Sequence, residues 1–152
     1  MSKEQIIEKL KKGSLWIFIV CVLAVLFNLL VIGWGIFRHS DALEIDAVTK
    51  YVFFREFVTY GLSAVIMLLA ALLFFRVAKS GIPFTVKNIR TVRIIGILFL
   101  VNAVIPTVIT GGVISPFSVQ NYSSLLEGLL LLFVAHYIRY GAMLQQESDE
   151  TL

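Results

Sequence analysis

The sequence predicts an all-α, polytopic membrane protein, a four-helix transmembrane bundle with a short N-terminal amphipathic helix and an interfacial basic elbow before the third helix. Its 152 residues are 59% hydrophobic and only 15% charged, which is too apolar for an ordinary soluble core. The apolar residues form four long, nearly uncharged runs instead of recurring at a period of 2 or 3.6. A bilayer core of roughly 30 Å needs about 20 helical residues, which each run supplies. We therefore expect one domain over residues 1–152, with helices at about 14–37, 57–78, 86–114 and 120–144.

The basic residues predict how the chain is oriented. They concentrate before the first run and between the second and third runs, whereas the connection between the first two runs mixes both signs of charge. By the positive-inside rule, the two basic segments and both termini are cytoplasmic. Attraction to anionic lipid of the inner leaflet accounts for the same residues, so the net charge of +3 is no argument for direct binding to nucleic acid. The residues that decide the orientation are Lys3, Lys9, Lys11, Lys12, Arg76, Lys79, Lys87, Arg90 and Arg93.

The N-terminal segment 2–12 has the pattern of a short amphipathic helix. Ile6, Ile7 and Leu10 share one helical face, and most of the lysines lie elsewhere. This pattern predicts a helix on the inner membrane surface, or alternatively a docking helix for a cytoplasmic partner. The apolar run that follows is too long for a secretory signal, so we expect an uncleaved first helix.

The basic elbow lies between the second and third runs. Gly81 is expected to end one helix, Pro83 prevents an immediate restart, and Thr85 is the expected N-cap of the next helix. Apolar residues then recur every three positions while the cations turn to other sides, so this part of the helix can lie at the interface. The cations of the elbow are Lys87, Arg90 and Arg93.

One ionisable residue interrupts the apolar runs. Glu127 lies in the fourth run, and a charged side chain inside a membrane is costly and usually functional. Counted from Tyr122 it is about five residues, or roughly 8 Å, from the outer side. Asn28, somewhat deeper in the first run, and Arg55, at the outer start of the second, are the expected partners of a polar site within the membrane. The alternative is a structural glutamate that is hydrogen-bonded near the interface.

Enzymatic and metal chemistry have no support in the residues. There is no nucleotide-binding glycine loop, no zinc spacing and no nucleophile with a base, so we expect neither an enzyme nor a cofactor. Cys21 is the only cysteine, which excludes an intrachain disulfide. His136 and His39 lie at opposite ends of the expected bundle, so a metal site is not expected either.

Two short motifs carry a resemblance to a known family. The first is Pro83-Phe84-Thr85 with the following NxR and RIIG patterns at 88–90 and 93–96, and the second is the segment 141–152, GAMLQQESDETL. With them the chain resembles the bacterial domain-of-unknown-function family 2975, whose members are small four-helix membrane proteins. The resemblance covers nearly the whole chain and implies the cytoplasmic membrane of a bacterium. The chain departs from the family's usual ending at Glu150, where an apolar residue is common, and at Leu152, which replaces isoleucine.

The resemblance implies no chemical activity, but members of the family often resemble partners of small helix-turn-helix regulators. The leading hypothesis is therefore a regulatory or interaction protein that holds a cytoplasmic protein partner on a face formed by Lys87, Arg90, Arg93, Glu147 and Asp149. The alternative is a small oligomeric transporter or proton-coupled carrier that uses Glu127. Self-association through small residues of the second helix, such as Gly61 and Ala64, is also compatible with the sequence.

Overall fold

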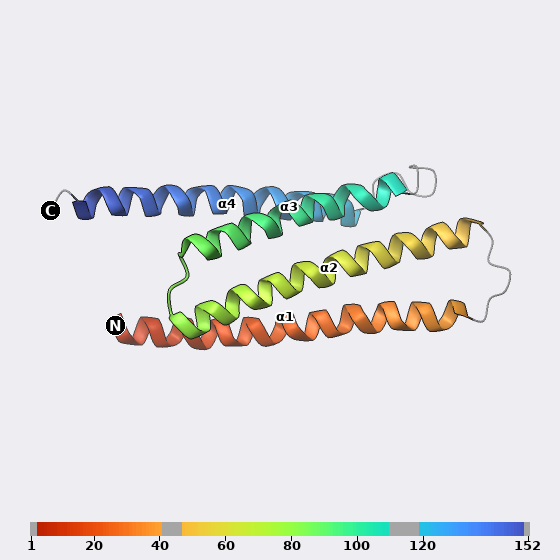
Figure 1. The fold of residues 1–152 in the computed structure, drawn as a ribbon, viewed down its shortest axis with the longest axis horizontal. Coiled ribbons are helices and arrows are strands. Elements are labelled where there is room, and N and C mark those ends of the chain that lie inside the picture. The colour runs from red at the N-terminus through yellow and green to blue at the C-terminus, as the bar shows by residue number, and fades with distance from the viewer. Residues whose placement is uncertain (1–2, 41–46, 110–118, 151–152) are drawn as a thin grey trace.

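The computed structural model describes residues 3–40, 47–109 and 119–150, and these residues form four long helices. They are α1 (Lys3–Ser40), α2 (Ala47–Ser80), α3 (Val86–Ile109) and α4 (Val119–Glu150). Successive helices run in opposite directions along the long axis (Figure 1). The start of α1, the connection between α2 and α3, and the end of α4 therefore lie at the same end of the molecule, which we call the basic end.

Three helices are long and apolar enough to cross a membrane, by length and composition. These segments are Glu4–Arg38, Thr49–Ser80 and Val86–Ile105. The described part of α4 contains no stretch that is equally long and equally apolar, because Glu127, His136 and Arg139 interrupt it. The all-helical fold is thus confirmed, and three of the four expected spans have the length and apolarity that crossing a membrane requires.

The N-terminal segment is not a separate helix, and in this respect the prediction was wrong. α1 runs without interruption from Lys3 to Ser40, through Gly13. A single glycine costs a helix only about 1 kcal/mol, which is too little to end one that good helix formers extend on both sides. An ion pair of 2.9 Å between Glu8 Oε1 and Lys12 Nζ, one turn apart, also supports this segment.

The other helix boundaries were predicted too short at several ends. α2 begins at Ala47 instead of about 57, and α4 continues to Glu150 instead of 144. The apolar runs mark only the part of each helix suited to lipid, whereas the helices continue into the polar residues that flank these runs. The expected end of the third helix, at 114, lies outside the described residues.

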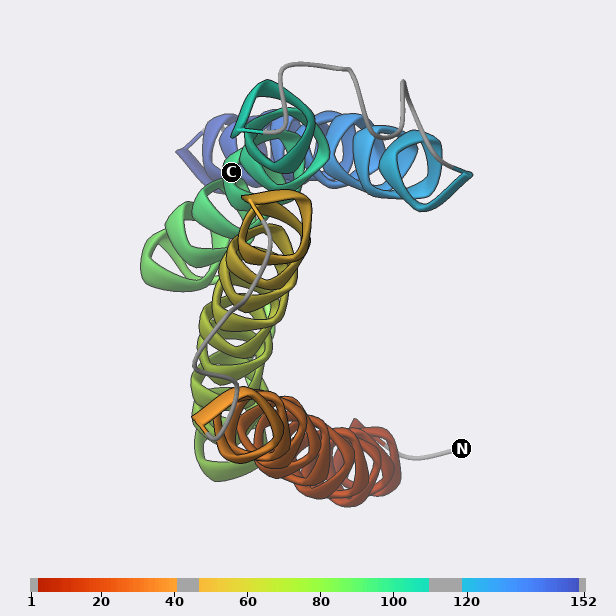
Figure 2. The same cartoon turned by 90° about the vertical axis from the view of Figure 1, so that its right-hand side faces the viewer.

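The four helices form an open row and not a closed bundle. α2 packs against α1 and α3, α4 packs against α3 alone, and the described residues of α1 and α4 do not touch. Seen along the long axis, the row is curved, with α1 and α4 at its two ends and an open side between them (Figure 2). Hydrophobic patterning predicts which helices exist, but it does not decide whether the first and last helices meet.

Small and polar residues lie on the face of α1 that packs against α2. Ser14, Cys21 and Asn28, seven residues apart, are all buried. A repeat of seven keeps the same residues on one seam between two helices that cross at a shallow angle. On α2 the same spacing separates Ala64 from Ala71, and both are buried.

Candidate functional site

The turn between α2 and α3 is built as the sequence predicts. Gly81 has a φ of 72°, which favours glycine, and its N–H donates to the Val77 carbonyl over 2.7 Å, so it ends α2. Thr85 Oγ1 accepts a hydrogen bond of 3.2 Å from the backbone N–H of Asn88, which confirms it as the N-cap of α3. The side chain of Asn88 in turn donates from Nδ2 to the Pro83 carbonyl over 3.0 Å. These bonds fix the course of the chain from one helix to the next.

The basic elbow directs its cations outwards. Lys87, Arg90 and Arg93 are all exposed, while Asn88 and Thr91, between them, are buried at 3% and 8% exposure. Arg76, at the end of α2, crosses to α3 and donates from Nη1 to Thr91 Oγ1 over 3.2 Å. The two helices are therefore tied together beside the turn, and the three elbow cations remain free to meet a partner or lipid phosphates.

The start of α1 packs onto this turn. A methyl group added at Gly81 would come within 2.9 Å of both Ile7 Cγ2 and Lys11 Cε. Such distances mean that side chains of the N-terminal segment lie against the glycine. The first turns of α1 are therefore part of the folded basic end, while the positive φ is the reason that glycine is favoured at position 81.

A cavity of about 260 Å³ opens at the basic end and is lined by residues of all four helices. Most of its lining is apolar, and Ser14 and Asn88 supply the polar groups. The apolar part comes from α1, α2, the turn and α3, with one residue from α4: Leu10, Leu73, Phe74, Val77, Pro83, Phe84, Ile89, Val92 and Ile138. Its size and apolar character suit one large hydrophobic side chain or part of an acyl chain.

A contact between two glycines sets the register of α3 against α4. A methyl group on Gly128 would lie 2.8 Å from the Gly96 carbonyl oxygen, and one on Gly96 would lie 3.1 Å from the Gly128 carbonyl oxygen. The two backbones therefore touch at this point, as close helix pairs in membranes do at small residues. Sequence reasoning missed this pair, although Ser124 and Gly128, four residues apart, form a small-xxx-small pattern that could have indicated it.

This register places Glu127 much deeper than the sequence suggested. Because α3 and α4 are antiparallel, Glu127 is level with position 97 of α3. The Arg76–Thr91 hydrogen bond aligns α2 with α3, so position 97, six residues beyond Thr91, is level with Ala70. Ala70 is 13 residues, or about 20 Å, from Phe57 and eight residues, or about 12 Å, from Ala78. Glu127 is thus level with the part of the apolar run of α2 that is nearer to the basic end.

The side chain of Glu127 points to the open side of the row. It is exposed, and no other group in the described part of the chain forms a hydrogen bond or ion pair with it. Glu127 precedes Ile138 by 11 residues, which is three helical turns, so both side chains lie on the same face of α4. Ile138 lines the cavity that Leu10 of α1 and Leu73 of α2 also line. Glu127 therefore faces the space between α4 and the α1–α2 pair.

The three residues expected to form a polar site are not brought together. Asn28 is buried between α1 and α2 at 8% exposure, and its Nδ2 donates to the Ala24 carbonyl over 2.8 Å. Two contacts between α1 and α2, of Gly35 with Phe53 and of Phe18 with Phe75, set the level of Asn28. They align Asn28 with positions 60–65 of α2. Asn28 is therefore about 8–15 Å farther from the basic end than Glu127. Arg55 is half-buried, at least five residues farther still. The structure therefore places Asn28 and Glu127 at different levels along the row of helices.

Two further polar features bear on the site. Asn102 on α3 is buried at 8% exposure, and its Oδ1 has no hydrogen-bond donor in the described residues. His136, on α4, is exposed, and no group of three or more potential metal ligands occurs among the residues described. Glu147 and Asp149 belong to the helical backbone of α4, but their side chains lie outside the described part.

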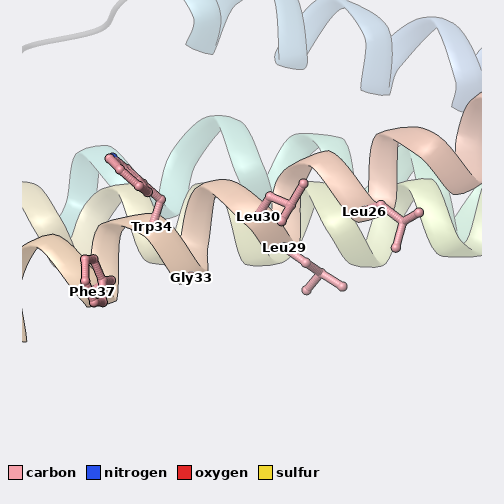
Figure 3. A pocket seen from close by; sticks show the side chains of 6 residues that line it. All are labelled: Leu26, Leu29, Leu30, Gly33, Trp34 and Phe37. Carbon is pink, nitrogen blue, oxygen red and sulfur yellow. The ribbon is translucent and has the colours of Figure 1, made fainter.

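An apolar hollow of about 450 Å³ lies along α1 beside Gly33. Its lining comes from this helix alone: Leu26, Leu29, Leu30, Gly33, Trp34 and Phe37 (Figure 3). The side chains project from the helix without a second helix over them, and Trp34 and Phe37 are 68% and 69% exposed. A surface of this kind on a spanning helix is suited to lipid acyl chains.

No protein-family model, curated protein or solved structure matches this chain.

Proposed function

We propose that this protein is an integral protein of the bacterial cytoplasmic membrane, with four spans and both termini in the cytoplasm, that binds a cytoplasmic protein partner at its basic end. One observation carries the proposal. The three segments that the sequence assigns to the cytoplasm gather at a single end, where residues of all four helices line an apolar cavity. A connector between two membrane helices needs neither a capped turn nor a cavity lined by four helices.

The packing of α4 supports a fourth span. α4 lies antiparallel to α3 and touches it at Gly96 and Gly128, so a membrane that α3 crosses also surrounds α4. With 32 residues α4 is about 48 Å long, more than the hydrocarbon thickness of roughly 30 Å. A fourth span returns the C-terminal segment to the side of the N-terminus, where the positive-inside rule expects cations such as Arg139.

The chemistry of the basic end indicates the kind of partner. The exposed cations Lys87, Arg90 and Arg93 attract an acidic surface, and the adjoining cavity accepts an apolar side chain. The acidic residues Glu147 and Asp149 at the end of α4 add a second sign of charge, which favours a protein with mixed charges over a nucleic acid. The resemblance to family 2975 suggests a small helix-turn-helix regulator, whose basic DNA-binding surface would meet this acidic segment.

The interaction function is favoured over a carrier by the distances between polar residues. A proton-coupled carrier would need Glu127 to exchange protons with neighbouring polar groups. Asn28 lies about 8–15 Å farther from the basic end than Glu127, and Arg55 lies farther still, so neither is within hydrogen-bonding reach of Glu127. A single carboxylate without a relay is a weak basis for coupled transport.

Crosslinking with mass spectrometry on native membranes tests the proposal. The wild-type chain should form crosslinks from its basic end to one cytoplasmic protein, and a variant lacking 145–152 should lose them or reduce them strongly. Lys50→Ala, at the opposite end of the molecule, is the matched control and should leave the crosslinks unchanged. Crosslinks that persist after the truncation, or that involve only copies of this chain, would contradict the proposed function.

A further inference from the structure

The open side of the row has an unusual combination of features. Two spanning helices, α1 and α4, lie at the two ends of the row without touching, and the space between them is bordered by α2 and α3 (Figure 2). On the α4 side Glu127 borders this space, because it is exposed and shares a face of α4 with Ile138, which lines the cavity. A charged group at this depth is costly unless an opposite charge or water accompanies it.

In the described part of the chain no cation pairs with Glu127, and none lies at its own level on α3 or α4. On α4 the nearest one is Arg139, 12 residues towards the basic end. On α3 the nearest is Arg93, four residues or about 6 Å closer to the basic end than position 97, and it forms no ion pair with Glu127. The remaining described cations flank the apolar runs at either end: Arg38, Lys50 and Arg55 at one end, and the lysines and arginines of the basic end at the other.

A second copy of the chain would not supply the missing charge. Inserted with the same orientation, it carries its cations at the same depths as the first copy, so none is level with Glu127. The partner must therefore bring a cation of its own. A lysine or arginine in the middle of a transmembrane helix carries a similar free-energy cost, because its charge is also unpaired in lipid. Pairing this cation with the carboxylate removes the cost of both unpaired charges.

We propose that the space between α1 and α4 is a docking site for a transmembrane helix of a different membrane protein, one that carries a basic side chain level with Glu127. The apolar faces of α1 and α4 contact the body of this helix, and the carboxylate selects it by charge. This site is distinct from the proposed cytoplasmic one, because it lies within the membrane and does not involve the C-terminal segment. The chain would then act as an assembly subunit inside the membrane as well as at its surface.

Designed peptides test the charge selection directly. The full chain is reconstituted in phosphatidylcholine vesicles with single-span Leu/Ala peptides that carry either lysine or glutamine at their midpoint. Association is measured by energy transfer from the labelled chain to the labelled peptide. The wild type should bind the lysine peptide about 5- to 30-fold more tightly than the glutamine peptide, and Glu127→Gln should abolish this difference.

A relocated carboxylate provides the control for position. The double variant Glu127→Leu with Leu126→Glu keeps one carboxylate at the same depth but turns it about 100° around α4, onto a face where Leu126 is 66% exposed. Peptides with a photoreactive group should crosslink to both α1 and α4 in the wild type and should lose the crosslink to α1 in the double variant. Equal binding of the two peptides by the wild type would overturn the proposal. Peptide crosslinks to α4 alone would also overturn the proposal. The same holds for crosslinks between α1 of one copy and α4 of another copy in vesicles that contain no peptide.

Discussion

Replacing Gly128 by alanine is the most informative test of how α3 and α4 pack. The added methyl group would lie 2.8 Å from the Gly96 carbonyl oxygen and equally close to Leu100 Cδ2. The leucine can change its rotamer, but the carbonyl oxygen belongs to a helical backbone and cannot move alone. The two helices must therefore separate by several tenths of an ångström along their shared contact.

The structure allows the size of the effect to be worked out. Inserting a methyl group into a tight contact costs about 1–3 kcal/mol, and alanine regains about 1 kcal/mol through its better helix propensity. The expected net loss of stability is therefore about 0–2 kcal/mol. Gly61→Ala on α2 is the matched control, because nothing lies within 4 Å of a methyl group at that position. It should gain about 1 kcal/mol, so the two variants should differ by about 1–3 kcal/mol, a factor of roughly 5–150 in the unfolding equilibrium.

Reversible unfolding by SDS in mixed micelles measures the difference. Dyes at positions 90 and 137, introduced in a Cys21→Ala background, report the separation of α3 from α4 by energy transfer. Gly128→Ala should unfold at a lower SDS fraction than the wild type, or at the same fraction, whereas Gly61→Ala should unfold at a higher one. Equal stabilisation by the two substitutions would refute the glycine contact and, with it, the depth assigned to Glu127.

Three further substitutions test the basic end. Gly81→Ala should lower the free energy of unfolding by about 1–2 kcal/mol, because alanine disfavours the left-handed backbone at this position. It should also displace Ile7, so hydrogen exchange in residues 3–12 should become faster. Unchanged exchange would contradict the contact between Gly81 and Ile7. Thr85→Ala should cost about 0.5–2 kcal/mol in SDS unfolding, whereas Thr85→Ser should retain most of the stability, and equal losses would argue against the cap. Thr91→Val should cost about 0.5–1.5 kcal/mol by removing the acceptor of Arg76, in addition to the hydrogen bond that Thr91 Oγ1 donates to the Lys87 carbonyl. Only the part due to Arg76 should disappear in an Arg76→Ala background.

Local signals in the sequence were sufficient for several elements of the fold. The apolar runs predict all four helices, because lipid requires continuous apolar length. Gly81 and Thr85 mark the end of α2 and the start of α3, because each supplies a backbone conformation or a hydrogen bond that few other residues provide. These features depend on residues close together in the chain.

Features that depend on contacts between distant segments were not predictable in the same way. The N-terminal amphipathic pattern is compatible with a surface helix or with an extension of α1, and only its contact with Gly81 decides between them. The depth of Glu127 depends on the register that Gly96 and Gly128 impose on α3 and α4. Counting from the end of an apolar run ignores this register, which explains why Glu127 was expected nearer to the outer end of the helices than it lies.

The candidate site was only partly accessible from the sequence for the same reason. Glu127 stands out because ionisable residues are rare in membrane helices. Its surroundings, however, depend on the open row of helices, and hydrophobic patterns do not distinguish an open row from a closed bundle. The cavity at the basic end also needs all four helices, so none of its lining residues is conspicuous alone.

The most direct test of the account is the membrane sidedness of single cysteines in intact bacterial cells. In a Cys21→Ala background, cysteines at positions 9, 79 and 141 represent the start of α1, the end of α2 and the last part of α4, and position 50 represents the opposite end. A membrane-impermeant maleimide should label position 50 in intact cells, and the other three only after the membrane is permeabilised. Labelling of position 141 from outside, with 79 protected, would show that α4 does not return to the side of the basic end, which would contradict both proposed sites.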